Sequence, residues 1–283
     1  MLMKEAKIMG IVNLTDNSYY GPSRMLGADG KTDTDKFREK VRTLLDEGAD
    51  IIDIGAVATD PGTEGIGALE EWKRLEPALD VMRADFPKAE ISIDTYLSEV
   101  VSRAYDKIGP FIINDISAGE ADREMLPLAA SLKLTYVAMH MRGTPKVMAG
   151  LTDYGPETSE FPSAVTRGVY RYFIDFENRA GNAGVEDWIL DPGFGFSKTI
   201  EQNYQLLDEL DVFRKFGRRI LIGVSRKSMI YRYFGTNADM ALPATQVLHF
   251  AALERGADIL RVHDAREAKE TVKLFAKLHR SAL

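Results

Sequence analysis

The stretch DWILDPGFGFSKT, residues 187–199, contains a pattern that recurs along the whole chain. Its first five residues are mostly apolar and aromatic, as expected of a short buried strand. A glycine-rich turn follows, and an amphipathic segment at 200–215 comes next, so the stretch predicts one strand–loop–helix unit. The loop is not a phosphate loop of the G-x-x-x-x-G-K-[ST] type, because Gly193 and Gly195 are too close together.

The same unit recurs along the chain. Strands are predicted at 6–12, 50–55, 90–94, 110–115, 134–140, 187–191, 219–225 and 258–263. Amphipathic helices are predicted at 33–47, 68–85, 97–107, 122–132, 162–183, 200–215, 240–255 and 264–280. This alternation predicts a parallel sheet closed into a (β/α)8 or TIM barrel, with residues 1–283 as a single domain. A doubly wound open sheet is the alternative, although GIVNLTDNS (10–18) lacks the glycine-rich signature that such a sheet carries after its first strand.

The composition excludes several classes of protein. The chain has 283 residues, of which 45% are hydrophobic, so it can bury a large core. Its net charge of −7, without a basic run, argues against nucleic acid or an anionic membrane as a partner. The absence of cysteine excludes disulfides, thiolate metal sites and a cysteine nucleophile. The apolar N-terminal stretch is too short for a signal peptide or a membrane span, so we expect a cytoplasmic protein.

Polar side chains gather where the predicted strands end. They are Asp53, Asp94, Asn114, Asp191, Arg261 and His263. In a (β/α)8 barrel the chemistry takes place at the C-terminal ends of the strands, so these residues are candidates for an active site. Alternation along a strand puts Arg261 and His263 on one face. Any single one of the acidic or amide residues could instead be a helix N-cap, because Asp and Asn favour that position.

Eight blocks of sequence, in order along the chain, resemble the signatures of the dihydropteroate synthase family. They are IMGIVNLT, GADIIDIG, ISIDT, IINDIS, HMRGTPKVM, ILDPGFGFSKTIEQN, IGVSRKS and RVHD, and they run from near residue 8 to near residue 264. Enzymes of this family are (β/α)8 barrels that use Mg²⁺ to join 6-hydroxymethyl-7,8-dihydropterin pyrophosphate to p-aminobenzoate and release pyrophosphate. The resemblance implies this transferase activity in folate biosynthesis. It also implies a homodimer, for which the segments 200–215 and 240–255 are candidates.

The resemblance implies a set of pterin-binding residues. They are Asp94, Asn114, Met139, Asp191, Phe194 and Lys227. The residue types suit this ligand, because a pterin edge carries N–H donors beside an acceptor, and carboxylates accept while an amide does both. Met139 and Phe194 would form apolar walls, and Lys227 would donate to ring acceptors. The glycines of the opening stretch would let the backbone approach a flat ligand, with Lys198 as a structural or rim charge.

The resemblance also implies sites for the other two ligands. Pyrophosphate is expected at Arg261, whose guanidinium forks onto phosphate oxygens, and at His263. Asn13 resembles the magnesium ligand of the family, and Mg²⁺ combines such an oxygen with waters and phosphates. Next to p-aminobenzoate we expect Thr59, Pro61 and Ser228, with Ser228 at a helix start that favours an anion. Arg226 is expected to be a structural ion-pair partner. The expected catalytic residues are Asn13, Lys227, Arg261 and His263.

Two loops depart from the family pattern. Asp16 and Asn17 stand where proline and aspartate are usual, and Asp60 stands where an arginine would help to hold pyrophosphate. These changes leave open a catalytically weak relative that only binds pterin. A pterin-dependent methyltransferase domain is another alternative, although SRKS and RVHD suit a pyrophosphate substrate. A Schiff-base aldolase with Lys227 as nucleophile is a further one, although Lys227 lies past the end of its strand.

Overall fold

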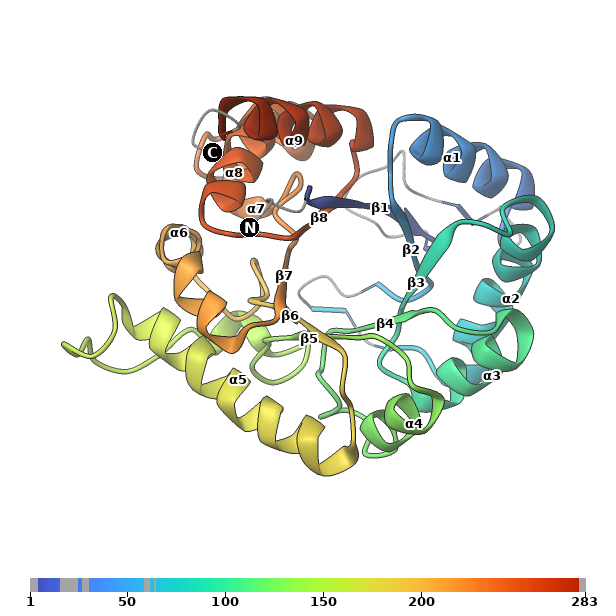
Figure 1. The fold of residues 1–283 in the computed structure, drawn as a ribbon, viewed down its shortest axis with the longest axis horizontal. Helices are drawn as coiled ribbons and strands as arrows, with labels where there is room; N and C mark the ends of the chain where they lie inside the picture. The colour runs from blue at the N-terminus through green and yellow to red at the C-terminus, as the bar shows by residue number, and fades with distance from the viewer. Residues whose placement is uncertain (1–4, 16–24, 27–30, 59–61, 64, 280–283) are drawn as a thin grey trace.

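The described residues of the computed structural model are 5–15, 25–26, 31–58, 62–63 and 65–279. Within them, parallel strands pair in chain order and the eighth pairs with the first, so that the sheet closes into a barrel. Figure 1 looks into this ring and shows the helices around its outside. The predicted (β/α)8 barrel is confirmed, and the open-sheet alternative is wrong. Among the helices of these residues, none has the length and apolar character needed to cross a membrane.

The elements follow the predicted order. The strands are β1 (Lys7–Asn13), β2 (Ile51–Gly55), β3 (Glu90–Asp94), β4 (Ile112–Asp115), β5 (Tyr136–Met139), β6 (Trp188–Asp191), β7 (Arg219–Ile222) and β8 (Ile259–Val262). The helices are α1 (Thr34–Asp46), α2 (Ala68–Asp85), α3 (Ser98–Ile108), α4 (Met125–Leu132), α5 (Ala164–Ala183), α6 (Ile200–Asp208), α7 (Ser228–Tyr231), α8 (Leu242–Glu254) and α9 (Ala265–His279). The 3₁₀ helices are η2 (Met148–Gly150), η3 (Leu210–Phe216) and η4 (Ala238–Ala241).

The predicted helix at 200–215 differs from the structure. It ends at Asp208, and the rest of the segment tightens into the 3₁₀ helix η3. Leu210 and Phe213 are both fully buried there, so the apolar spacing that suggested one helix continues through two elements. The short α7 fits the helix start that was expected at Ser228.

Side-chain caps fix where several helices begin. The Thr199 side chain accepts a hydrogen bond from the Gln202 backbone N–H, and the Gln202 side chain accepts one from the Thr199 N–H. This capping box starts α6 directly after the glycine-rich turn. Asp33 and Ser163 cap α1 and α5 with their side-chain oxygens. The turn after β6 is therefore held between a strand end and a capped helix.

Apolar residues fill the barrel and its outer shell. Inside the ring, seven strands contribute the plug residues Met9, Ile51, Ile112, Val137, Ile189, Leu221 and Ile259. Outside it, a larger cluster joins strands to helices, and Trp188 packs there against Phe173 and Phe176 of α5. Each large apolar side chain that is fully buried contributes roughly 1.5–3 kcal/mol to folding.

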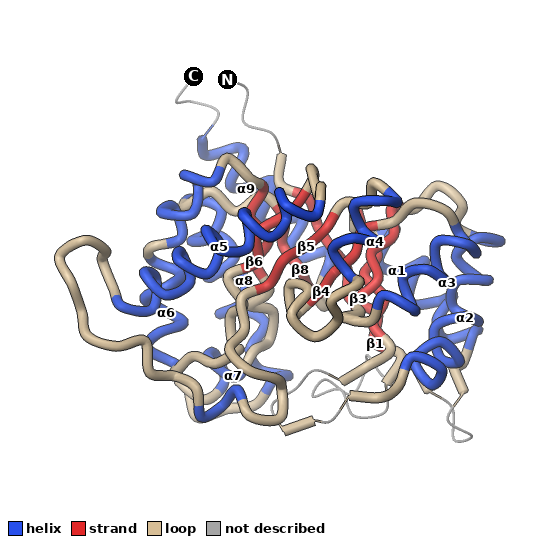
Figure 2. The backbone as a smooth tube through the Cα atoms, turned by 90° about the horizontal axis from the view of Figure 1, so that it is seen from below, coloured by secondary structure: helices blue, strands red, loops and turns tan. Residues whose placement is uncertain are grey.

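The plug also decides which residues face the active site. Because strand side chains alternate, the residue two positions beyond a plug residue points inward again, closer to the C-terminal end of its strand. Residues in this position include Asp53, Asn114, Met139, Asp191 and Arg261. Parallel strands bring these ends together, and in the side view of Figure 2 loops gather with α7 below the strands. Polar groups from separate strands therefore meet at the C-terminal end of the barrel, next to the apolar plug residues.

Candidate active site

Arg261 lies between two aspartates at the centre of this inward-facing set. Its Nε atom donates to Asp53 Oδ2 at 2.6 Å, and its Nη2 atom donates to Asp94 Oδ2 at 2.7 Å. Asp53 is fully buried and also accepts from Ser92 Oγ at 2.6 Å and from Asn114 Nδ2 at 3.3 Å. One arginine thus joins β8 to β2 and β3. The guanidinium expected to bind pyrophosphate is shared with two carboxylates.

Asp53 is the residue of this group whose role the sequence did not predict. The sequence predicts Asp53 at the end of a strand but assigns no ligand to it. The structure makes it the common acceptor for Ser92, Asn114 and Arg261, so it orients two of the residues expected to bind substrate. An acidic residue two positions after the apolar plug residue Ile51 was the available signal.

The electrostatics of this group depend on Arg261. Burial raises the pKa of the Asp94 carboxyl, and the positive charge of Arg261 opposes that rise. The neighbouring charges of Asp53 and Asp191 raise the pKa of Asp94 further. The arginine is therefore the group that allows several buried carboxylates to lie close together.

Asp191 and the turn after β6 form a second wall. Asp191 Oδ1 accepts from the Gly193 backbone N–H at 2.8 Å. Burial raises the pKa of Asp191, and the nearby charge of Lys227 opposes this. Gly193 has a φ of +71°, and a Cβ atom built on it would lie 2.0 Å from the His140 carbonyl oxygen. Only glycine fits there, so the turn can bring its backbone N–H close to Asp191.

Lys227 reaches across to the same turn. Its Nζ atom donates to the Phe194 carbonyl oxygen at 2.5 Å and lies 4.8 Å from the centre of the Phe196 ring. Phe196 packs against the apolar cluster that contains Met139, whereas the Phe194 ring is fully buried in the outer shell. Phe194, which was predicted as an apolar wall, thus lies in the core cluster, and Phe196 is the ring of this turn that lies beside Met139 and Lys227.

Lys198 is buried beneath the turn, so it is not a rim charge. Its Nζ atom donates to the carbonyl oxygens of Gly193 at 2.9 Å and Phe196 at 3.0 Å, and it lies 3.0 Å from His140 Nδ1. Burial lowers the pKa values of both Lys198 and His140 well below their ordinary range. A neutral His140 ring can accept the Lys198 bond. The structural role expected for Lys198 is the one that these contacts describe.

His263 follows β8 and contacts the loop after β7. Its Nδ1 atom is 3.1 Å from Ser225 Oγ, and its backbone N–H donates to the same oxygen at 3.2 Å. Burial, together with the positive charge of Arg261, lowers the pKa of His263 to about 3. The imidazole is therefore neutral at physiological pH. It can offer a hydrogen bond to an anion, but no positive charge.

The remaining predicted residues are only partly described. Asn13 ends β1, and the strand register places it opposite Gly55, which in turn lies opposite Asp94. Ser228 is the first residue of α7. The predicted residues Thr59 and Pro61, and the unusual Asp16, Asn17 and Asp60, lie outside the described residues. In the part of the chain that is described, no group of three His, Asp or Glu side chains is placed to hold a metal ion.

A buried glutamate lies just behind the site. Glu71 of α2 is fully buried, and the Thr95 side chain and the Arg74 charge beside it favour its charged form. Burial outweighs them and, together with the charge of Asp94, raises the pKa of Glu71 from 4.5 to about 7. The folded protein therefore binds a proton that the unfolded chain releases at lower pH. Stability should fall as pH rises from about 4.5 to about 7, by at most about 3 kcal/mol.

Replacing Glu71 by glutamine should remove this pH dependence. Urea unfolding at pH 5 and pH 8 should show that the wild type loses more unfolding free energy between these values than Glu71→Gln does. The exposed neighbour Glu70 supplies the matched variant Glu70→Gln, which should keep the wild-type slope. Equal slopes for wild type and Glu71→Gln would show that Glu71 does not titrate in this window.

The chain is similar to known pterin binding enzymes over most of its length. A family model described as pterin binding enzyme matches residues 9–263. Dihydropteroate synthase from Escherichia coli is 34% identical over 271 residues, which cover 94% of this chain and 89% of that protein. The chain belongs to the dihydropteroate synthase family of pterin binding enzymes. The resemblance drawn from the eight sequence blocks is confirmed.

Other relatives match over nearly the whole chain. The folic acid synthesis protein fol1 of Schizosaccharomyces pombe is 34% identical over 96% of this chain, which spans only 36% of that longer protein. A Yersinia pestis dihydropteroate synthase in complex with a sulfonamide drug superimposes with a TM-score of 0.85 at 30% identity, covering 99% of this chain and 95% of that one. A Xanthomonas albilineans synthase with 4-aminobenzoic acid gives a TM-score of 0.83 at 30% identity, covering 98% and 94%.

Proposed function

We propose that this chain is a dihydropteroate synthase of folate biosynthesis. It joins 6-hydroxymethyl-7,8-dihydropterin pyrophosphate to p-aminobenzoate and gives dihydropteroate and pyrophosphate. The observation that carries the proposal is the set of Asp94, Asn114, Asp191 and Arg261 facing one another above the barrel plug. Relatives named dihydropteroate synthase over nearly the full chain support it, and they favour it over the methyltransferase alternative.

The pterin ring would lie between two groups of polar side chains. Asp94 and Asn114, already bonded to Arg261 and Asp53, are held in fixed orientations on one side. Asp191 and Lys227 are held on the other side by the turn after β6. Carboxylates accept the N–H groups of the pterin, and the amide and ammonium supply donors for its acceptors. Met139 and Phe196 would contact its faces.

The pyrophosphate would lie near Arg261 and His263. Arginine contributes a permanent charge, and the neutral imidazole contributes one hydrogen bond. Asn13 would hold Mg²⁺ through its amide oxygen, which fits an ion that takes its other ligands from waters and phosphates. The bound ion would neutralise part of the negative charge on the leaving group. The p-aminobenzoate carboxylate would lie at Ser228, beside the predicted residues Thr59 and Pro61.

The reaction needs positioning more than a strong base. The bond between the pterin methylene carbon and the pyrophosphate oxygen breaks, and its electron pair leaves with pyrophosphate. The positive charge on the methylene carbon is delocalised into the pterin, which Asp94 and Asp191 would stabilise. The neutral amine of p-aminobenzoate then attacks this carbon and loses a proton to solvent. Fixed side chains hold both reactants in line, which supplies most of the rate enhancement.

For the proposed homodimer we expect an interface in the α7–α9 region. Six large apolar side chains are exposed there: Tyr233, Phe234, Met240, Val247, Leu274 and Leu278. Protein interfaces are built where such side chains form a contiguous patch. Of the two candidate segments, 240–255 contributes to this region. We expect neither nucleic acid nor a membrane as a partner, because the net charge is −7. We place the protein in the cytoplasm, in keeping with a chain without cysteine.

Pyrophosphate release by the purified protein tests the proposed function. Release should require the pterin pyrophosphate, p-aminobenzoate and Mg²⁺ together, and EDTA should stop it. A sulfonamide should slow release in competition with p-aminobenzoate. No release, with pterin binding still measurable by calorimetry, would overturn the synthase and leave the pterin-binding relative that Asp16 and Asp60 suggest. Release that continues in EDTA would overturn the magnesium assignment alone.

A further inference from the structure

Arg226 occupies an unusual place between two residues of the candidate site. It follows Ser225, which contacts His263, and it precedes Lys227, which reaches the turn after β6. Its backbone has a φ of +54°, a left-handed conformation that non-glycine residues rarely adopt. Such a conformation persists only where surrounding contacts hold it, and it is common at functional sites. The contacts of Arg226 therefore show what holds the 225–228 segment in place.

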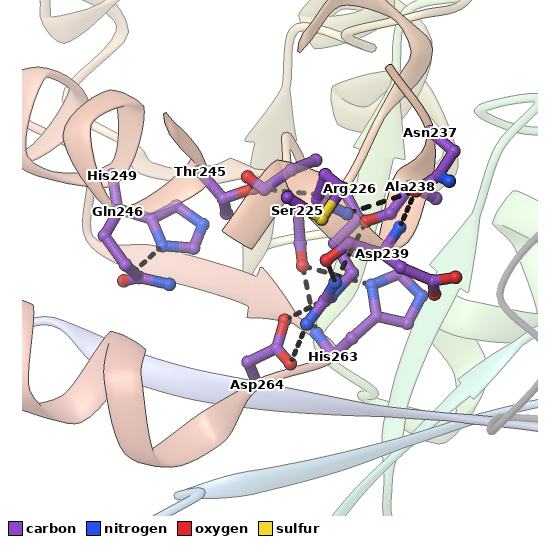
Figure 3. A network of polar contacts seen from close by, with 12 residues as sticks. Ser225, Arg226, Asn237, Ala238, Asp239, Thr245, Gln246, His249, His263 and Asp264 are labelled. Atoms are coloured by element: carbon purple, nitrogen blue, oxygen red, sulfur yellow. Dashed lines mark hydrogen bonds and ion pairs between the residues drawn. The ribbon is translucent and has the colours of Figure 1, made fainter. Parts of the chain in front are cut away.

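The Arg226 side chain turns away from the site and is almost completely buried. Its Nε and Nη2 atoms donate to the two carboxylate oxygens of Asp264, both at 2.8 Å. Its Nη1 atom donates to the carbonyl oxygens of Ala238 and Asp239, both at 2.9 Å, and its backbone N–H donates to Thr245 Oγ1 at 3.1 Å. Figure 3 shows this network. Arg226 thus joins the β7 loop to the start of α9, to η4 and to α8.

The Arg226–Asp264 pair fixes two ligand regions relative to each other. On the β7 side the next two residues are Lys227 and Ser228, expected at the pterin and at p-aminobenzoate. On the β8 side the residue before Asp264 is His263, expected at pyrophosphate. The bidentate pair sets both the distance and the angle between these two loops, because a guanidinium and a carboxylate bond in one plane. A single ammonium group cannot reproduce this fork.

We propose that Arg226 is a positioning residue, which sets the distance between the amine-binding and pyrophosphate-binding sides of the site through Asp264. It acts through Lys227, Ser228 and His263 and does not touch the substrates itself. The inference rests on the proposed synthase function. The Arg226–Asp264 ion pair, expected to be structural, would then also determine kcat, because the attacking amine and the departing oxygen must lie in line.

Turnover of Arg226→Lys at saturating concentrations of both substrates tests this inference. We expect kcat to fall by about 10- to 100-fold, because small misplacements of reacting groups cost that much. Asp264→Asn should give a similar loss. The double variant should lose no more than the worse single variant, because both changes break the same bridge. The matched control is Arg255→Lys, which breaks a fork to Asp208 and Ala251 far from the site and should keep kcat within about twofold.

Thermal unfolding separates positioning from a general loss of structure. If Arg226→Lys and Arg255→Lys lower Tm alike but only the former lowers kcat, Arg226 acts by positioning. A kcat within twofold of the wild type for Arg226→Lys, or multiplicative losses in the double variant, would overturn the inference. If Arg226→Lys does not fold, Asp264→Asn carries the same expectation.

If the wild type itself releases no pyrophosphate, the proposed function fails separately. Calorimetry with inorganic pyrophosphate then decides, with at least tenfold weaker binding supporting the positioning role and unchanged binding overturning it.

Discussion

Arg261→Met should lower the unfolding free energy by about 3–5 kcal/mol at pH 7, because it leaves two buried carboxylates without their counter-charge. Asp53 is fully buried and Asp94 nearly so, and both accept hydrogen bonds from the Arg261 guanidinium. Methionine keeps the length of the side chain but supplies neither charge nor donors. Urea denaturation of wild type and variant measures the difference. Adding Asp53→Asn to the variant should recover part of the loss, since one of the stranded charges is then gone.

The pH dependence of this loss identifies its cause. Burial raises the pKa of Asp94 even with Arg261 in place, and without the opposing positive charge that pKa should rise further. The folded variant then binds more protons than the unfolded chain, so its deficit should be smaller at pH 5 than at pH 8. Arg103→Met removes an exposed arginine that pairs with Glu99 one helical turn away, and it should cost less than about 1 kcal/mol. A deficit of that small size for Arg261→Met would contradict the central role assigned to Arg261.

Asp191→Asn should lower kcat/KM for the pterin substrate by about 100- to 10,000-fold. Asparagine preserves the shape and can still accept from the Gly193 N–H, but its amide NH₂ would face the donors of the pterin edge. Two hydrogen bonds to a charged acceptor are worth about 1.5–3 kcal/mol each, which gives this range. Stability should not suffer, because burial already disfavours the charged form of Asp191. Pyrophosphate release measures the rate, and calorimetry with the pterin measures the affinity.

The same region of the chain offers a matched control for Asp191→Asn. Asp187 immediately precedes β6, and its exposed side chain pairs with Arg219. Asp187→Asn should leave kcat/KM within about twofold, since it lies at the opposite end of the strand from Asp191. If Asp191→Asn bound the pterin as tightly as the wild type, the assignment of Asp191 to the pterin edge would be wrong.

The features that could be predicted from the sequence are those that follow from regular strand and helix periodicity. Polar residues at the predicted strand ends, among them Asn114, Asp191 and Arg261, indicated an active site at one end of the barrel, and the parallel strands bring these ends together. The sequence did not predict that Asp53 joins Arg261 to Asn114. That contact spans 208 residues and depends on how the barrel closes. Local pattern carries no information on such partners.

The glycine-rich turn shows a second limit of prediction. In a strand, Phe194 and Phe196 would share a face, and either could be chosen as the apolar wall. Gly193 and Gly195 both have positive φ angles, so the backbone reverses twice and the two rings point to different environments. The burial of Lys198 could not be predicted either, because the sequence does not show that the carbonyl groups of Gly193 and Phe196 accept hydrogen bonds from it.

Closure of the barrel has a consequence for how the chain acquires its site during synthesis. β1 pairs on one edge with β2 and on the other with β8. Arg261 of β8 contacts Asp94, which precedes it by 167 positions, and Asp53, which precedes it by 208 positions. Contacts of such long sequence separation form slowly, and the second edge of β1 stays unpaired until the last strand has left the ribosome. A chain truncated before residue 261 would lack the arginine that makes the buried carboxylates tolerable. Premature termination would therefore yield an aggregation-prone product with no partial activity, and the last strand made is the one that completes the enzyme.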